Sequence, residues 1–108
     1  MTVALPLVSS IPNYRLGTSL DGRQFIFDVR WNAREGFWYM DILTDEEVML
    51  RAGIKIVLGA VLGGPPLDAR FPRGLLTAVD TSGENREATF EDLGSRVEVI
   101  FVSPEDLQ

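Results

Sequence analysis

The sequence predicts an all-β fold, a small antiparallel barrel or sandwich of six to seven strands built on a three-stranded N-terminal meander. Three observations predict it. Apolar and polar residues alternate along several short segments, which is typical of half-buried strands. Turn residues separate these segments at short intervals. The only helical character lies in one short turn at 90–94.

The first hairpin is predicted by Asp21-Gly22, a pair that readily takes the two positive φ angles of a type I′ turn. A two-residue turn here places Leu16 opposite Phe27 on one face. It places Arg15 opposite Asp28 on the other. Apolar residues then meet apolar ones and opposite charges meet, so the register is self-consistent.

The second hairpin is predicted by a four-residue loop closed by Asn32 and Phe37, with Gly36 in the left-handed region. This loop places Trp31 opposite Trp38. The pairs Val29–Met40 and Phe27–Ile42 follow from the same register. The large side chains of residues 19–43 are therefore expected to form the inner face of the meander, and an outer face carries Arg15, Asp28, Arg30, Tyr39 and Asp41.

The rest of the chain contains shorter apolar segments. We expect further strands at 47–50, 54–58, 75–79 and 96–102, a proline-rich loop at 63–73, a polar hairpin loop at 80–87, and a single helical turn at 90–94 with Thr89 as a possible cap. These elements divide into an N-terminal arm or edge strand at 1–12, a single β domain at 13–103 and a short acidic tail at 104–108.

The composition excludes most site chemistry. The chain has no cysteine and no histidine, so it lacks thiol chemistry, the usual near-neutral base and the commonest metal ligand. The acids at 80 and 91 have the spacing of a calcium loop, but Asn85 stands at the sixth position, which requires glycine. We therefore expect no catalytic residue, no cofactor and no metal. A small hydrolase would need a polar cleft with convergent carboxylates, which no pattern indicates.

The charge is unevenly distributed. Residues 1–79 carry eight acidic and eight basic groups, whereas residues 80–108 carry eight acidic groups and two basic ones, so the net charge of −6 lies in the last quarter. Phosphate binding needs basic surface, so we expect neither nucleic acid nor an anionic membrane as a partner. A small oligonucleotide-binding β-barrel, suggested by surface arginines near aromatic residues, remains an alternative.

Two places could contact another protein. Trp31 and Trp38 lie at the end of the meander beside the loop that carries Arg34, a composition typical of interface anchors, although the pair could instead close the core. The second place is the proline-rich loop, with Arg70, Phe71 and Arg73. The N-terminus is a poor signal peptide and the longest apolar run is too short to span a bilayer, so the chain is expected to be made in the cytoplasm.

Most of the chain, from about residue 13 to residue 102, resembles the baseplate plug family of contractile-tailed bacteriophages, including cyanophages. The resemblance rests on LDGRQFIFDVRWNAREGFWYMDI at 20–42, GIKIVLG at 53–59, GLLTAVD at 74–80 and FEDLGSRVEVIFV at 90–102. Its most specific parts are the Trp-Asn-x-Arg-x-Gly-x-Trp-Tyr-Met-Asp-Ile run at 31–42 and the Asp-Leu-Gly-Ser-Arg run at 92–96.

The resemblance implies a structural virion protein without catalytic residues. Such plugs sit in the tail baseplate near the tail axis, where the central hub and spike meet the surrounding wedge proteins. It implies several copies in a symmetric assembly. A subunit of a contractile injection machine derived from a phage tail is an alternative with the same features.

Overall fold

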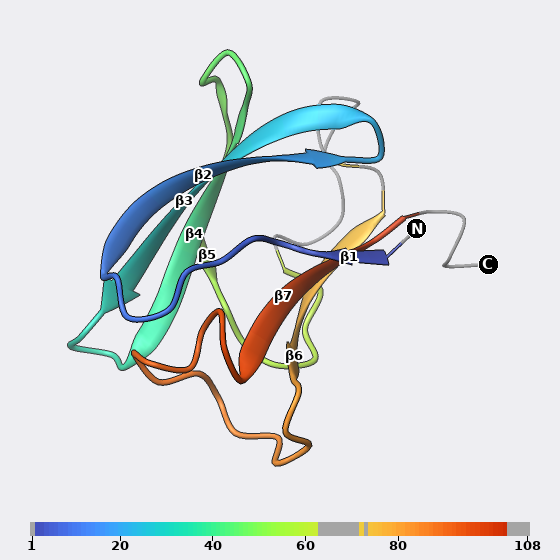
Figure 1. Ribbon diagram of the computed structural model, residues 1–108. Helices are drawn as coiled ribbons and strands as arrows, with labels where there is room; N and C mark the ends of the chain where they lie inside the picture. Colours follow the sequence, from blue (N-terminus) through green and yellow to red (C-terminus); the bar gives the residue numbers. More distant parts are fainter. Residues whose placement is uncertain (1, 63–71, 73, 104–108) are drawn as a thin grey trace.

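The structure, a computed structural model, describes residues 2–62, 72 and 74–103. Seven strands form two antiparallel sheets, one ordered β1-β7-β6 and the other β2-β3-β4-β5 (Figure 1). The described residues contain no helix, so the all-β prediction is confirmed, and the strands do not close into a barrel. The strands are β1 (Thr2–Ala4), β2 (Asn13–Leu20), β3 (Arg23–Asn32), β4 (Phe37–Thr44), β5 (Met49–Lys55), β6 (Leu75–Asp80) and β7 (Val97–Val102).

The β2–β3 hairpin has the predicted turn and register. Asp21 and Gly22 have φ angles of 52° and 79°, which are the left-handed values that a type I′ turn requires. Leu16 pairs with Phe27 and Arg15 with Asp28. The sequence therefore determines this hairpin through its turn residues and its alternation together.

The β3–β4 hairpin is also as predicted. Gly36 has a φ of 76° and its N–H donates to the Asn32 carbonyl at 2.8 Å, while the Asn32 side chain accepts from the N–H groups of Arg34 and Glu35. An asparagine that caps its own turn in this way holds the loop in one conformation. Trp31 then pairs with Trp38.

The inner faces of both sheets meet in one hydrophobic core. Phe27 and Val29 from β3 are fully buried, as are Val99 and Phe101 from β7. Alternation along β7, with Val97, Val99 and Phe101 buried, matches the sequence prediction for the last strand. Burial of large apolar groups from both sheets is the main stabilising contribution, because each removes a large apolar area from water.

The outer face of the meander carries ion pairs across the strands. Arg15 Nε donates to Asp28 at 2.8 Å, and the Arg30 guanidinium binds Asp41 with one N–O distance of 3.1 Å. Asp41 was expected on this face, but its side chain is buried because Arg30 and the N–H of Gly53, 2.8 Å away, cover it. Burial tends to raise the Asp41 pKa, but these hydrogen bonds outweigh it and the pKa is lowered.

The region after β4 differs from the prediction. Two strands were expected, at 47–50 and 54–58, but the structure has one strand, β5, whose pairing with β4 shifts register twice. Gly53, with a φ of 67°, marks this irregularity and lets its N–H reach Asp41. Beyond β5 the chain crosses to the other sheet, where Leu58 bridges Ala78 of β6. Ile54 and Ile56 are buried where β5 ends beside β4, and Val57 and Leu58 are half-buried as the chain passes to the other sheet, so the apolar character of 54–58 does not mark a central strand.

The N-terminal segment was expected to be an arm or an edge strand, and its first residues form an edge strand. Val3 pairs with Phe101 of β7, and β1 lies at the edge of its sheet. The Leu5 N–H continues this pairing to the Val99 carbonyl at 2.9 Å, and the Leu5 side chain is buried. Residues 2–5 therefore belong to the fold of this chain.

The connection between β6 and β7 is longer than the predicted loop at 80–87, since it runs from residue 81 to residue 96. The helical turn expected at 90–94 is a hydrogen-bonded turn and not a helix. Thr89 does not act as a side-chain cap; its N–H and hydroxyl instead donate to the Asp92 carboxylate. Strand β6 lies where it was predicted. Most of the loop at 63–73 and the tail at 104–108 lie outside the described residues.

The two faces of β3 should respond differently to mutation. Phe27→Ala removes a fully buried ring from the core and should lower the free energy of unfolding by ~3–5 kcal/mol. Asp28→Ala removes only one member of a partly exposed ion pair and should cost less than ~1 kcal/mol. Chemical denaturation of both variants measures the difference, and equal losses would mean that the face assignment is wrong.

Candidate protein-interaction site

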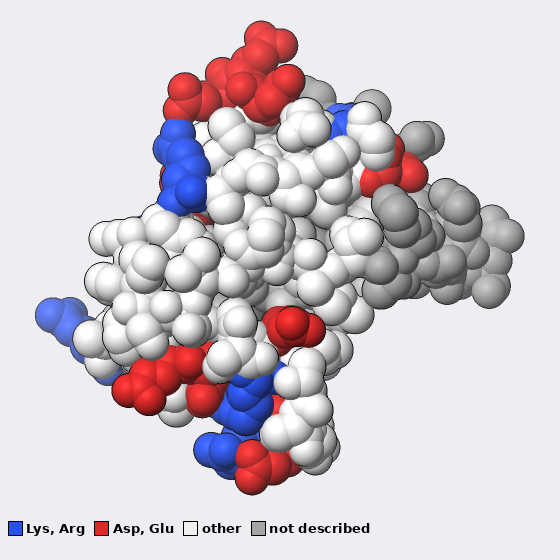
Figure 2. Space-filling model, in the orientation of Figure 1, with Lys and Arg blue, Asp and Glu red and all other residues white. Residues whose placement is uncertain are grey.

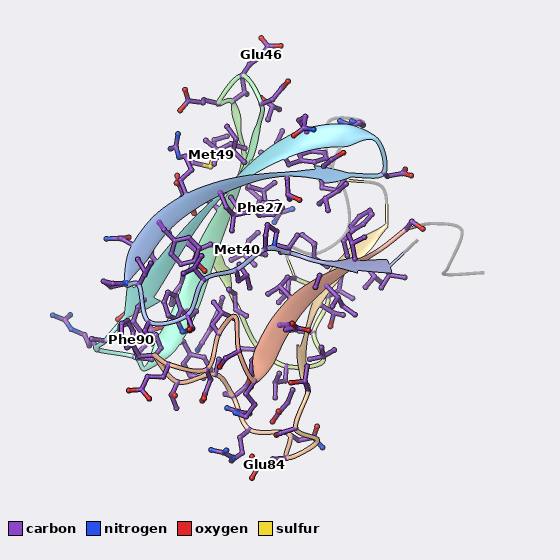
Figure 3. The ribbon with its side chains drawn as sticks, viewed as in Figure 1. Phe27, Met40, Glu46, Met49, Glu84 and Phe90 are labelled. Atoms are coloured by element: carbon purple, nitrogen blue, oxygen red, sulfur yellow. The ribbon has the colours of Figure 1, made fainter. Side chains whose placement is uncertain are left out.

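Three aromatic rings meet at the end of the meander beside the β3–β4 turn. The ring centroids of Trp31 and Trp38 lie 5.3 Å apart, and Phe90 lies 5.8 Å from each of them. Phe90 stacks on Trp38 with an interplanar angle of 8°. Figure 3 labels Phe90, which comes from the β6–β7 connection and lies next to the β3–β4 turn. We call these three residues the aromatic cluster.

The two tryptophans are not equivalent. Trp38 is 1% exposed, and its indole N–H donates to the Thr89 carbonyl at 3.0 Å, so it belongs to the core of this chain. Trp31 is only partly buried and packs against the core from its edge. A partly covered indole held rigidly by two other rings is the kind of side chain that anchors a protein interface.

The turn beside the cluster carries an unpaired cation. The Arg34 residue is exposed, and its guanidinium has no partner among the described residues. Glu35, its neighbour, accepts a short hydrogen bond from the Tyr39 hydroxyl, which raises the Tyr39 pKa. Glu35 is therefore tied to the sheet while Arg34 is left for solvent or a partner.

The structure thus brings Trp31, Trp38 and Arg34 together at one end of the sheet, as the sequence predicted. Phe90 was missed, because it lies about fifty residues further along the chain and no local pattern connects it with the meander. The other three candidates, Arg70, Phe71 and Arg73, lie outside the described residues.

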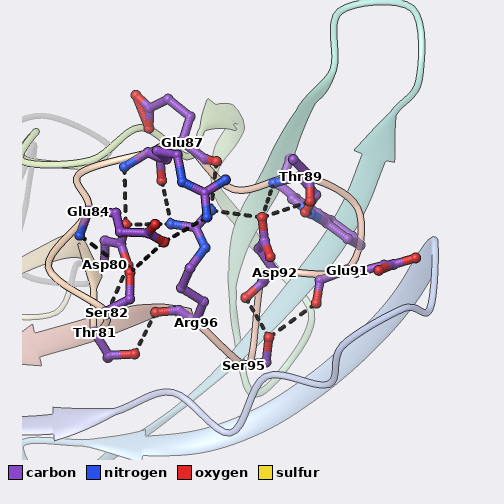
Figure 4. A network of polar contacts seen from close by, with 12 residues as sticks. Asp80, Thr81, Ser82, Glu84, Glu87, Thr89, Glu91, Asp92, Ser95 and Arg96 are labelled. Atoms are coloured by element: carbon purple, nitrogen blue, oxygen red, sulfur yellow. Dashed lines mark hydrogen bonds and ion pairs between the residues drawn. The ribbon is translucent and has the colours of Figure 1, made fainter.

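A second polar site is built around Arg96 (Figure 4). The Arg96 guanidinium forms a short ion pair with Asp80 and a bond of 2.7 Å with Asp92. It also donates to the backbone carbonyls of Arg86 and Glu87, at 2.8 and 3.0 Å. The guanidinium of one arginine therefore binds several points along the β6–β7 connection. We call this set of contacts the Arg96 network.

The two acids of the Arg96 network are held in their charged forms. Burial alone would raise the Asp80 pKa, but bonds from Ser82 and from the Arg86 N–H, with the Arg96 charge, lower it to about 2. The Asp80 side chain is fully covered, and its own hydrogen-bond partners surround it. The bond from Arg96 and those from Thr89 lower the Asp92 pKa well below its usual range. A calcium ion at this loop would have to displace Arg96 from Asp80.

A different group of acids is exposed. Asp45, Glu46 and Glu47 form the turn between β4 and β5, and Figure 2 shows acidic side chains gathered at that end of the molecule. Val48 and Met49, next to them, are 46% and 47% exposed. Adjacent acids in an extended chain point to opposite faces, so the sequence predicts that Glu46 and Glu47 are solvated and not an acid/base pair. Both are exposed, and Glu47 forms an ion pair with Arg15.

The arrangement offers no catalytic constellation among the described residues. Asp45 and Glu46 line an open hollow of about 550 Å³ together with Arg23, but both acids are exposed and therefore lack the dry surroundings that tune a catalytic carboxylate. The described residues include no group of three potential metal ligands. They also contain no helix long and apolar enough to cross a membrane.

The Arg96 network should be visible in the pH dependence of stability. Because Asp80 and Asp92 have lowered pKa values when folded, the stability they contribute is present above their ordinary pKa of 3.8 and is lost as the pH falls toward about 2. We expect Arg96→Ala to lower the melting temperature at pH 7 and to flatten its fall between about pH 4 and pH 2.

The matched control is Arg86→Ala, because the Arg86 side chain forms, among the described residues, only an exposed pair with Glu84. It should leave both the melting temperature and its acid dependence nearly unchanged. Thermal melts from pH 7 to pH 2 measure both quantities. If the two variants behave alike, the Arg96 network does not stabilise the β6–β7 connection.

Comparison with protein families matches residues 2–105 to the family described as cyanophage baseplate Pam3 plug gp18. The comparison with curated proteins gave no significant match. The match covers nearly the whole chain, including both sheets, the aromatic cluster and the Arg96 network. The chain therefore belongs to the family of cyanophage baseplate plug proteins, which are structural components of the phage tail.

Proposed function

We propose that this chain is a structural plug of a contractile tail baseplate, placed near the tail axis and joining the central hub and spike to the surrounding wedge proteins. Membership of the plug family over residues 2–105 is the observation that carries the proposal. Several copies act in a symmetric assembly within the virion, after synthesis in the host cytoplasm. The chain has no enzymatic role and binds no cofactor.

Contact with a neighbouring baseplate protein is made at the aromatic cluster and the β3–β4 turn. Three features support this site: Trp31 is only partly buried, Phe90 and Trp38 hold it rigidly, and Arg34 is an exposed cation without a partner among the described residues. Rigid aromatic side chains lose little conformational entropy when they bind, and a rim charge selects and orients the partner.

The proline-rich segment that contains Arg70, Phe71 and Arg73 supplies a second contact. Its two cations and one aromatic residue have the composition of an interface, and they suit an acidic surface on a neighbour. The same composition would serve in a contractile injection machine derived from a phage tail. The two assemblies differ in the particle that contains the chain, so isolating that particle distinguishes them.

An oligonucleotide-binding role is the weaker candidate. Arg15, Arg30 and Arg96 are each bound to carboxylates, and the acidic turn at 45–47 is exposed. A strand of phosphates would have to break these pairs and lie against a chain of net charge −6. Retention on a polyanion column that falls steeply with salt would favour nucleic acid over baseplate assembly.

Removing the gene tests the proposed function directly. Particles made without this chain should lack complete, infectious tails, and the parent protein supplied in trans should restore them. Normal infectious particles without the chain would contradict a baseplate role.

Reversing the charge at the turn should weaken assembly without affecting the fold. Arg34→Glu should reduce copurification with tail proteins by about tenfold in affinity, which is about 1.4 kcal/mol, and leave the melting temperature unchanged. Arg86→Glu, on the β6–β7 connection, is the comparison variant. If only Arg86→Glu reduces copurification, the contact lies on that connection and not at the β3–β4 turn.

The two tryptophans should separate folding from binding. Trp38→Ala should lower the free energy of unfolding by ~3–5 kcal/mol, because it empties a buried site and removes one of the two hydrogen bonds to the Thr89 carbonyl, the other coming from the Asp92 N–H. Trp31→Ala should cost less in stability and more in copurification. Denaturation and copurification of both variants measure this, and a Trp31 variant that assembles like the parent would show that the cluster only closes the core.

A further inference from the structure

The two sheets have four edges, and three of them are poorly suited to accept another strand. β1 has three residues, which leaves little backbone to pair. β5 is irregular at Gly53 and carries Arg51 and Lys55. The edge of β6 is covered by this chain, since the N–H groups of Gly59 and Leu62 donate to the carbonyls of Ala78 and Leu76. Short, irregular, charged or covered edges are the usual protections against strand addition.

The fourth edge, β2, is longer and more regular, and its one charged side chain, Arg15, is bound to Asp28 and Glu47. It pairs with β3 over all eight residues without a register shift, and it contains no proline. Leu20 and Arg23 close a two-residue turn. Every second residue of β2, counted back from Leu20, therefore points its backbone N–H and C=O groups toward β3. Those of the residues between them face outward, and no hydrogen bond from another described residue reaches them. These residues are Asn13, Arg15, Gly17 and Ser19.

Gly17, at the centre of this edge, is not required by the fold of the single chain. Its φ is not in the left-handed region. A Cβ built on it would meet only the Phe25 carbonyl oxygen, at 3.8 Å, which is ordinary contact. Glycine weakens a strand, and inside one it often marks a place where another backbone approaches closely. The glycine therefore favours an occupied edge.

We propose that β2 pairs antiparallel with β2 of a second copy of this chain, which joins the two four-stranded sheets into one continuous sheet. Leu16 faces Leu16 of the second copy, and Tyr14 faces Thr18. On the opposite face Arg15 lies across from Gly17, whose missing side chain leaves room for the arginine stem. The half-buried stripe of Tyr14, Leu16 and Thr18 becomes covered by the same stripe of its partner.

The neighbouring registers are less favourable. Outward-facing residues must pair with one another, so the register changes in steps of two. One step places Arg15 opposite Arg15, where like charges repel. The step in the other direction places Gly17 opposite Gly17 and separates the two Leu16 side chains. The proposed register is the one that joins the apolar residues and accommodates the arginine.

Sedimentation equilibrium of the isolated full chain tests the pairing, with Gly17→Glu and Gly17→Arg as the variants. The parent should form a dimer of twice its 12.0 kDa. Arg15 is already bound to Asp28 and Glu47, so the three side chains together carry one negative charge. Gly17→Glu adds a carboxylate facing this group at two symmetric positions and should weaken the dimer roughly two- to thirty-fold, and Gly17→Arg should tighten it by a similar factor. Circular dichroism and thermal melts confirm that each variant is folded.

Ser19→Glu and Ser19→Arg are the matched controls, because Ser19 faces the neutral Asn13 in the proposed register. Charge sign at Ser19 should change the dimer constant much less than it does at Gly17. A parent chain that stays monomeric, a dimer indifferent to charge at Gly17, or equal weakening by both Gly17 variants would each overturn the proposal. The measurement uses the isolated chain, so its result tests the β2–β2 pairing independently of the baseplate role.

Discussion

The structure depends on the burial of one face of the β2–β3–β4 meander against β7. Two short turns with left-handed residues, Asp21-Gly22 and Gly36, fix the register of these strands. Once the register is fixed, Phe27 and Val29 must point to the same side, and β7 covers them with Val99 and Phe101. A slip of one residue would turn the whole apolar set toward water, so the turns and the core enforce each other.

That dependence explains which parts of the fold could be predicted from the sequence. The meander, β6 and β7 are set by local alternation and local turns, and both meander registers were predicted residue by residue. The crossing after β5 was not, because the apolar residues near Ile54 and Ile56 have no local sign of which sheet will cover them. The irregular course of β5 depends on the hydrogen bond from the Gly53 N–H to Asp41 of β4, and no local pattern predicts a contact between strands.

The candidate site also has a part that the sequence predicts and a part that it does not. Trp31 and Trp38 were placed together by the meander register, but Phe90 and the Thr89 carbonyl reach them from a distant connection that no local pattern could place. The acidic surplus of the last quarter also has a partly structural role, because Arg96 binds two of its carboxylates. The exposed charge is therefore distributed differently from the charge in the sequence, with Asp45 and Glu46 at one end of the meander and Arg34 at the other, while Glu47 is paired with Arg15.

We propose that this pair of packed sheets serves as a structural plug in the baseplate. Electron cryo-microscopy of purified tail particles is the measurement that tests it most directly. We expect density for two packed sheets near the tail axis, with Trp31 and Arg34 against a neighbouring protein. Density for the chain only at the periphery of the baseplate, or particles that do not contain it, would contradict this role as an axial plug.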